Sequence, residues 1–109
     1  MTRLPEPLAS GCAALQILCL RHADDDVEVV LADLPANVAG VCERVGPSGW
    51  RISISRRDAT ASPLLALLAL VHEWGHYRAW GTSGQHHHRG HWPAEMARAH
   101  RVIATLSAA

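Results

Sequence analysis

The residues best suited to chemistry in this chain lie in the segment His72-Glu73-Trp74-Gly75-His76, an HExxH motif. On a helix, His72 and His76 are four positions apart and project from one face, so both imidazoles can bind the same metal ion. Zinc suits such a pair of nitrogen ligands. Glu73 lies one position further round, where a carboxylate can take a proton from an attacking water but is poorly placed as a ligand. The motif therefore predicts a zinc-dependent hydrolytic site with Glu73 as general base.

An apolar run precedes the motif and predicts the helix that carries it. Ser62 is a typical N-cap residue, Pro63 suits the first helical position, and Gly81 favours a helix end at about Trp80. The run between them has no charge and contains Leu64, Leu65, Leu67, Leu68, Leu70 and Val71. A helix that is apolar all round is expected in a core. Glu73 and the two histidines would then need a metal ion, or hydrogen-bond partners in the core, to be satisfied there.

A third protein ligand has to come from the chain after the motif. Glu95 follows His76 by 19 positions, which leaves room for a helix end, a loop and a returning helix. That last helix is opened by Pro93, and its apolar stripe consists of Ala99, Val102, Ile103 and Leu106. Glu95 extends the stripe, although the helix dipole alone also favours a glutamate in a first turn. The rival ligands lie in the glycine-containing segment 81–92 and are His86, His87, His88 and His91. Because runs of histidine are more typical of solvated loops, the sequence favours Glu95.

Composition bounds the size and the class of the protein. With 109 residues, of which 49% are hydrophobic, we expect one domain over 1–109 with a real core but no second lobe. A formal net charge of zero and the lack of a basic block argue against a nucleic-acid binder. The longest apolar run is too short to span a membrane, and no signal peptide is recognisable, which favours a cytoplasmic protein. Cys12, Cys19 and Cys42 lack metal-binding spacing and are expected to be reduced core residues.

The remaining patterns predict an α+β fold. In chain order the expected elements are a helix over Leu8 to His22, strands over Val27 to Leu31, Val41 to Val45 and Trp50 to Ser55, a polar connection over Arg56 to Ala61, the motif helix and the last helix. We expect the three strands to form a mostly antiparallel sheet. The last strand alternates apolar and polar residues just before the motif helix, which indicates an edge strand flanking the site. Edge strands bind extended peptides through main-chain hydrogen bonds.

Several of these features together resemble the ImmA/IrrE-type metallopeptidases. They are a short strand, Leu34-Pro35, Gly40, a hairpin ending in Ile52-Ser53-Ile54, the HE-x-GHY form of the motif, and Glu95-x-x-x-Ala99. The likeness covers roughly residues 27 to 106, and the compact plan is also similar to the minigluzincins. It implies a minimal zincin-like zinc endopeptidase of the gluzincin type, with His72, His76 and Glu95 as ligands and Glu73 as base. The chain departs from the ImmA/IrrE pattern in its leucine-rich run before the motif and at Ser55, where asparagine is common.

The expected activity is zinc-dependent hydrolysis of peptide bonds in extended protein segments. Tyr77, His100 or a loop histidine can stabilise the oxyanion, and the sequence does not choose among them. The alternative is a regulatory or protein-interaction domain in which a structural zinc stabilises a small fold without turnover. Because so short a chain has no second lobe to enclose a cleft, we expect a latent site covered by the segment 81–92 or by a second copy in a homodimer.

Overall fold

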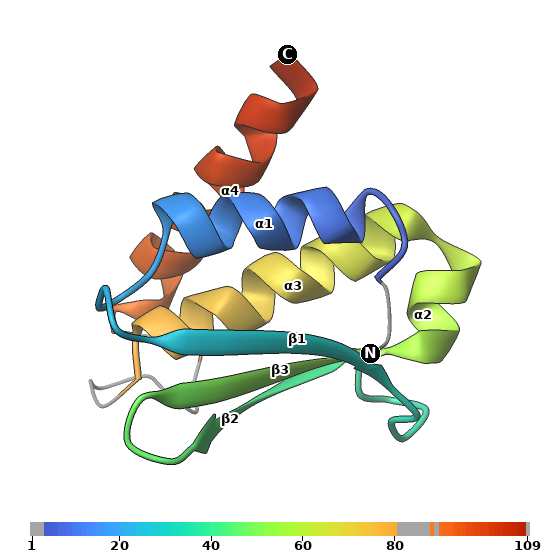
Figure 1. Ribbon diagram of the computed structural model, residues 1–109. Coiled ribbons are helices and arrows are strands. Elements are labelled where there is room, and N and C mark those ends of the chain that lie inside the picture. Colours follow the sequence, from blue (N-terminus) through green and yellow to red (C-terminus); the bar gives the residue numbers. More distant parts are fainter. Residues whose placement is uncertain (1–3, 81–87, 89, 109) are drawn as a thin grey trace.

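The computed structural model describes residues 4–80, 88 and 90–108, which form an α+β fold of four helices and one three-stranded sheet (Figure 1). In chain order the elements are α1 (Leu8–Leu18), β1 (Asp26–Ala32), β2 (Gly40–Val45), β3 (Gly49–Ser55), α2 (Arg56–Ala61), α3 (Pro63–Arg78) and α4 (Trp92–Ala108). Helices α1 and α3 cover one face of the sheet, and the C-terminal turns of α4 project beyond α1 (Figure 1). Within the described residues, no helix is both long and apolar enough to cross a membrane.

The sheet is mixed, with strand order β1-β3-β2. Strand β3 pairs in parallel with β1 and antiparallel with β2, so Ile52 lies between Val29 and Cys42. The expectation of a mostly antiparallel sheet with β3 at its edge is therefore wrong: β3 is central, and β2 is an edge strand. The connection 33–39 leads from β1 to β2 and leaves room for one strand between them. The tight hairpin after β2 then places β3 in that gap.

The motif helix α3 begins as the sequence predicts. The Ser62 side chain accepts a hydrogen bond from the backbone N–H of Leu65 (3.4 Å), and Pro63 is the first helical residue. Ser55 caps a helix in the same way, by accepting from the backbone N–H of Asp58 (3.4 Å), so the predicted polar connection after β3 is the short helix α2. The sequence signal for α2, a serine followed three residues later by an aspartate, resembles a capping box.

The prediction that α3 is buried all round is wrong for its first two turns. One side is buried through Ala66, Ala69 and Leu70, whereas Leu64, Leu65 and Leu68 keep 64%, 48% and 51% of their surface exposed. A three-stranded sheet and two neighbouring helices are too small to enclose a 16-residue helix completely. The apolar surface that remains uncovered lies at the end of α3 that leads into the motif.

The last turn of α3 holds the end of α1. The indole N–H of Trp74 donates to the carbonyl of Cys19 (2.8 Å), and the Arg78 guanidinium donates to the carbonyls of Cys19 (3.1 Å) and Leu20 (2.8 Å). These side chains satisfy carbonyls at a helix end, which explains why α1 stops at Leu18 rather than at the predicted His22.

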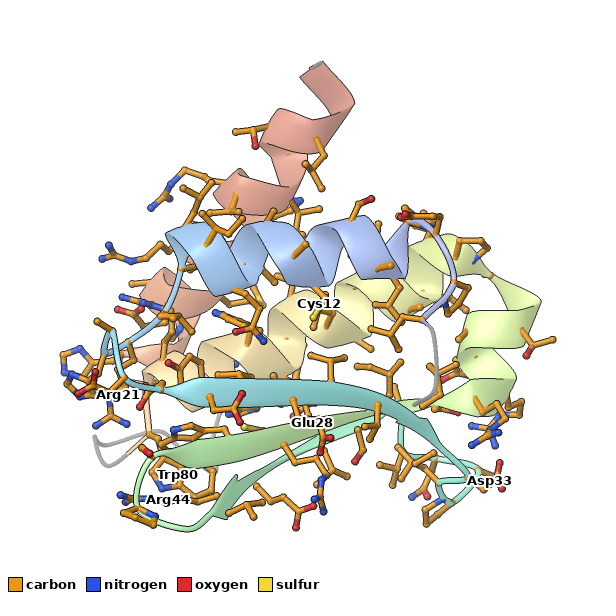
Figure 2. All side chains as sticks on the ribbon, viewed as in Figure 1. Cys12, Arg21, Glu28, Asp33, Arg44 and Trp80 are labelled. Atoms are coloured by element: carbon orange, nitrogen blue, oxygen red, sulfur yellow. The ribbon has the colours of Figure 1, made fainter. Side chains whose placement is uncertain are left out.

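All three cysteines are free thiols, as the sequence predicts. Cys19 is buried, while Cys12 and Cys42 are half-buried. Cys12 lies between α1 and α3 (Figure 2), and burial raises the pKa of its thiol.

Candidate metal centre

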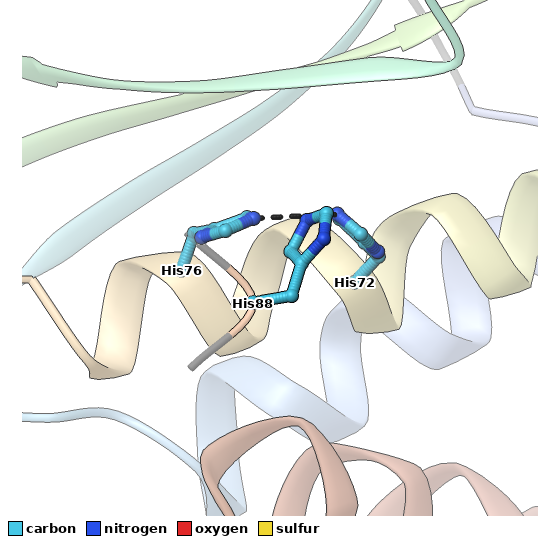
Figure 3. Close-up of side chains that lie close together, drawn as sticks. All are labelled: His72, His76 and His88. Carbon is cyan, nitrogen blue, oxygen red and sulfur yellow. Dashed lines mark hydrogen bonds between the residues drawn. The ribbon is translucent and has the colours of Figure 1, made fainter. Parts of the chain in front are cut away.

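Three imidazoles converge on one point above α3 (Figure 3). His72 and His76 rise from successive turns of the helix, as their spacing predicts, and their Nε2 atoms lie 3.3 Å apart. His88 comes from the chain that precedes α4, and its Nε2 lies 3.0 Å from Nε2 of His72. One ligand atom from each residue lies within 4.8 Å of the other two, so the group can hold a metal ion.

The separation of these nitrogens fits zinc. Ligand nitrogens about 2.0–2.1 Å from a tetrahedral zinc lie roughly 3.3 Å from one another. The two Nε2 separations involving His72, 3.3 and 3.0 Å, are close to that value. Burial, together with the neighbouring imidazole of His88, lowers the pKa of His72. The neutral imidazole is the form that binds a metal, so the surroundings of His72 favour the ligating state.

Glu73 is buried beside the histidines, with 8% of its surface exposed. One of its carboxylate oxygens, Oε2, lies 3.9 Å from Nε2 of His72. Burial raises the pKa of Glu73 to about 7, which is where a general base works best near neutral pH. A Cβ added at Gly40 would lie 2.9 Å from Cγ of Glu73, so a glycine at this position lets the edge strand β2 approach the carboxylate.

The carboxylate of Glu95, the predicted third ligand, has arginine partners in this structure. It accepts a hydrogen bond from Nε of Arg78 and lies 3.5 Å from Nε of Arg98. Among the described residues, the group able to hold a metal contains His88 and does not include Glu95. The ligand role of Glu95 therefore stays a prediction, and the structure gives this residue a second role as the partner of Arg78.

The other candidate residues are distributed around the molecule. The hydroxyl of Tyr77 donates to Asp25 (2.5 Å) and accepts from the backbone N–H of Arg21 (2.8 Å), so it is engaged in the core as an anchor rather than at the histidine group. His100 is exposed and borders an apolar groove between α3 and α4. His91 is exposed just before α4. His86 and His87 lie outside the described residues.

Two adjoining hollows flank the HE pair, and both are lined by Gly40, His72 and Glu73. The first, of about 390 Å³, extends towards the start of α3 and is bordered by Val38, Asp58, Leu65 and Leu68. The second, of about 300 Å³, extends towards the end of α3 and is bordered by Val41, Cys42, His76 and Trp80. Together they form a groove between α3 and the edge strand β2, with Glu73 at its middle.

Trp92 is a residue of this centre that the sequence did not single out. Its indole N–H donates to the backbone carbonyl of His72 (3.2 Å), and its ring lies against those of His72, His76 and His88. The sequence signal that could have identified Trp92 is its position, four residues after His88 and at the first residue of the last helix.

Comparison with known proteins adds no further information: no family model, curated protein or solved structure matches this chain.

The raised pKa of Glu73 predicts a pH-dependent stability for the metal-free protein. The unfolded carboxyl loses its proton near its ordinary value of 4.5, whereas the folded one keeps it up to about 7. The folded state thus binds more protons between these values, and the free energy of unfolding falls as the pH rises through that window. Glu73→Gln removes this titration, so its stability relative to the parent should increase by roughly 3 kcal/mol between pH 5 and pH 8. Urea unfolding with a chelator present measures this, and a pH-independent difference would contradict it.

The two roles of Glu95 predict different outcomes for Glu95→Ala. If Glu95 only pairs with Arg78, the variant loses about 2 kcal/mol of stability, because a mostly buried guanidinium loses its charged partner and keeps only its hydrogen bonds to carbonyls. Its zinc affinity then stays within about twofold of the parent. Arg78→Ala is the matched variant, since it removes the same ion pair from the other side and should also retain zinc. A loss of at least about tenfold in zinc affinity for Glu95→Ala alone would instead establish Glu95 as a ligand.

Proposed function

We propose that this chain is a zinc-dependent peptidase that cleaves extended segments of other proteins. The observation that carries the proposal is the buried Glu73 carboxylate beside a group of three imidazoles that can hold a metal ion. The groove between α3 and β2, which passes over both, supports a peptide-sized substrate. The resemblance to the ImmA/IrrE-type metallopeptidases and the minigluzincins supports the same activity and a minimal zincin-like fold.

His72, His76 and His88 would hold the zinc ion, which when bound supplies a Lewis acid that polarises the scissile carbonyl and makes water more acidic. Glu73 takes a proton from the attacking water and delivers it to the leaving amine. Without a metal ion, burial raises the pKa of Glu73 to about 7, so the carboxylate readily takes up a proton that it can later deliver. No covalent intermediate is required.

The edge strand β2 is the binding element for the substrate main chain in this proposal. Its inner-face residues Gly40 and Cys42 border the groove, and its outer edge is not paired with another described strand. An extended peptide can add to such an edge by main-chain hydrogen bonds. The apolar border of the larger hollow favours substrates that place an apolar side chain next to the scissile bond.

A structural metal without turnover is the second candidate function. It is favoured by the position of His88, since an ion shared with His72 would tie α3 to the chain leading into α4. Small domains gain much stability from such a link. A strong rise in melting temperature with zinc, in the absence of any hydrolysis, would favour this function.

The first test is the activity of Glu73→Gln. The substitution removes the base but keeps the size of the side chain, so the variant should bind zinc like the parent and lose at least about a thousandfold in kcat/KM. Hydrolysis of a quenched-fluorescence peptide library is the measurement. Glu28→Gln is the matched control, because Glu28 lies on β1, at the other edge of the sheet from β2, near Arg51 (3.0 Å), and should retain full activity. Equal activity in Glu73→Gln and the parent would remove Glu73 as the base.

The substrate preference gives a second prediction. Leu68 borders the larger hollow of the groove, whereas Leu64, which is just as apolar and also exposed, does not. Leu68→Glu should therefore lower kcat/KM for peptides with leucine or phenylalanine at the cleavage site by about tenfold or more. Leu64→Glu should change it by less than about twofold. Equal effects of the two substitutions would show that this hollow does not bind the substrate side chain.

A further inference from the structure

We infer that Trp92 is a positioning residue that holds His88 in place as a metal ligand. The inference rests on the metal-binding part of the proposed function and goes beyond it, because it identifies what keeps the third imidazole at the site.

Trp92 contacts all three members of the histidine group. Its ring centroid lies 4.5 Å from that of His88, 5.0 Å from that of His72 and 5.6 Å from that of His76. Its indole N–H also donates to the backbone carbonyl of His72 (3.2 Å). The indole is thus fixed to the helix that carries two ligands while it packs against the ring of the third.

His88 depends on such support more than the other two ligands do. His72 and His76 are held by the backbone of α3, whereas His88 lies outside any helix or strand and is exposed. Fixing an exposed side chain in one rotamer costs conformational entropy, and a packed neighbour that restricts its ring lowers this cost when a metal binds. Trp92 is the aromatic ring closest to His88 in the described structure, and it is anchored by its own hydrogen bond.

The arrangement predicts an energetic coupling between Trp92 and His88. If Trp92 acts on the metal only through His88, its removal matters when His88 can bind and has no effect when His88 is absent. A residue that merely stabilised the fold would weaken metal binding equally in both backgrounds, or in neither. A double-mutant cycle separates these cases.

The experiment measures Zn²⁺ and Co²⁺ affinity by competition with a chromophoric chelator, for Trp92→Leu, His88→Ala and the double variant. Leucine keeps apolar volume for packing but removes the ring faces and the N–H. We expect Trp92→Leu and His88→Ala each to weaken binding by at least about tenfold, and Trp92→Leu to add less than about twofold in the His88→Ala background. The visible spectrum of bound Co²⁺ in Trp92→Leu should approach that of His88→Ala.

Two further variants serve as controls. Trp80 is also half-buried and borders the same groove, but its ring packs on Trp50, with centroids 5.2 Å apart. Trp80→Leu should therefore leave the Co²⁺ spectrum unchanged. Trp92→Phe keeps an aromatic face against His88 and should stay within about threefold of the parent in affinity. If circular dichroism shows that the leucine variant does not fold, Trp92→Met, which keeps apolar volume without a ring, replaces it in the cycle.

The inference is overturned if Trp92→Leu binds metal within about twofold of the parent, if its loss is the same with and without His88, or if His88→Ala has no effect. None of these measurements uses peptide hydrolysis. If metal binds with the expected coupling and no peptide is cleaved, the proposed peptidase activity fails while the role of Trp92 stands.

Discussion

The position of every candidate catalytic group depends on how closely α3 approaches its neighbours on two sides, and a glycine permits the approach on each. At Gly40 a side chain would collide with Glu73, and at Gly75 it would lie 3.0 Å from Cα of Met96 in α4. The first contact brings the edge strand over the carboxylate and buries it. The second brings the start of α4 against the motif, which places Trp92, one turn before Met96, beside the histidine rings. Both sides of the site are thus determined by backbone proximity rather than by long side chains.

The same stretch of α3 that presents the metal group also fixes the helix in the fold. Helical geometry directs positions 72, 73 and 76 to the groove and positions 74, 77 and 78 to the opposite side. On that side Trp74 and Tyr77 are fully buried, and both form hydrogen bonds with the chain between α1 and β1. Arg78 donates a hydrogen bond to a carbonyl that follows α1 and forms an ion pair with Glu95 of α4. The residues that anchor the helix alternate along two turns with those that face the groove. A displacement of the helix would therefore disturb both sets of contacts. This favours a rigid site, as a catalytic or metal-binding centre requires.

Much of this arrangement could be predicted from the sequence, and the failures have physical causes. Ser62 and Pro63 mark the start of α3 through local preferences, and the alternation around Ile52 indicates a half-buried strand. The elements themselves could therefore be predicted. Strand order could not be predicted, because alternation is the same in a central strand and in an edge strand with one covered face. The pattern alone could not decide between Glu95 and His88 as third ligand, because a carboxylate on a core-facing stripe can bind a metal ion or pair with an arginine equally well. Arg78 lies in the last turn of the motif helix, and its presence there was the sequence signal that Glu95 could pair with an arginine.

The electrostatics of the site favour a bound cation. Glu73 is buried with a raised pKa, and the neighbouring His72 has a lowered one, so burial disfavours the charged form of both residues. A divalent cation among the imidazoles would suit the neutral state of His72, which is the form that binds a metal, and would offset the effect of burial on Glu73 by stabilising its carboxylate. Other contacts of the motif helix do not involve the metal group, including the ring packing of Tyr77 on Trp50 and Trp74 and the hydrogen bond from Arg78 to Leu20. A buried carboxylate that is costly to ionise without a nearby cation is more typical of functional sites than of residues that only stabilise a fold.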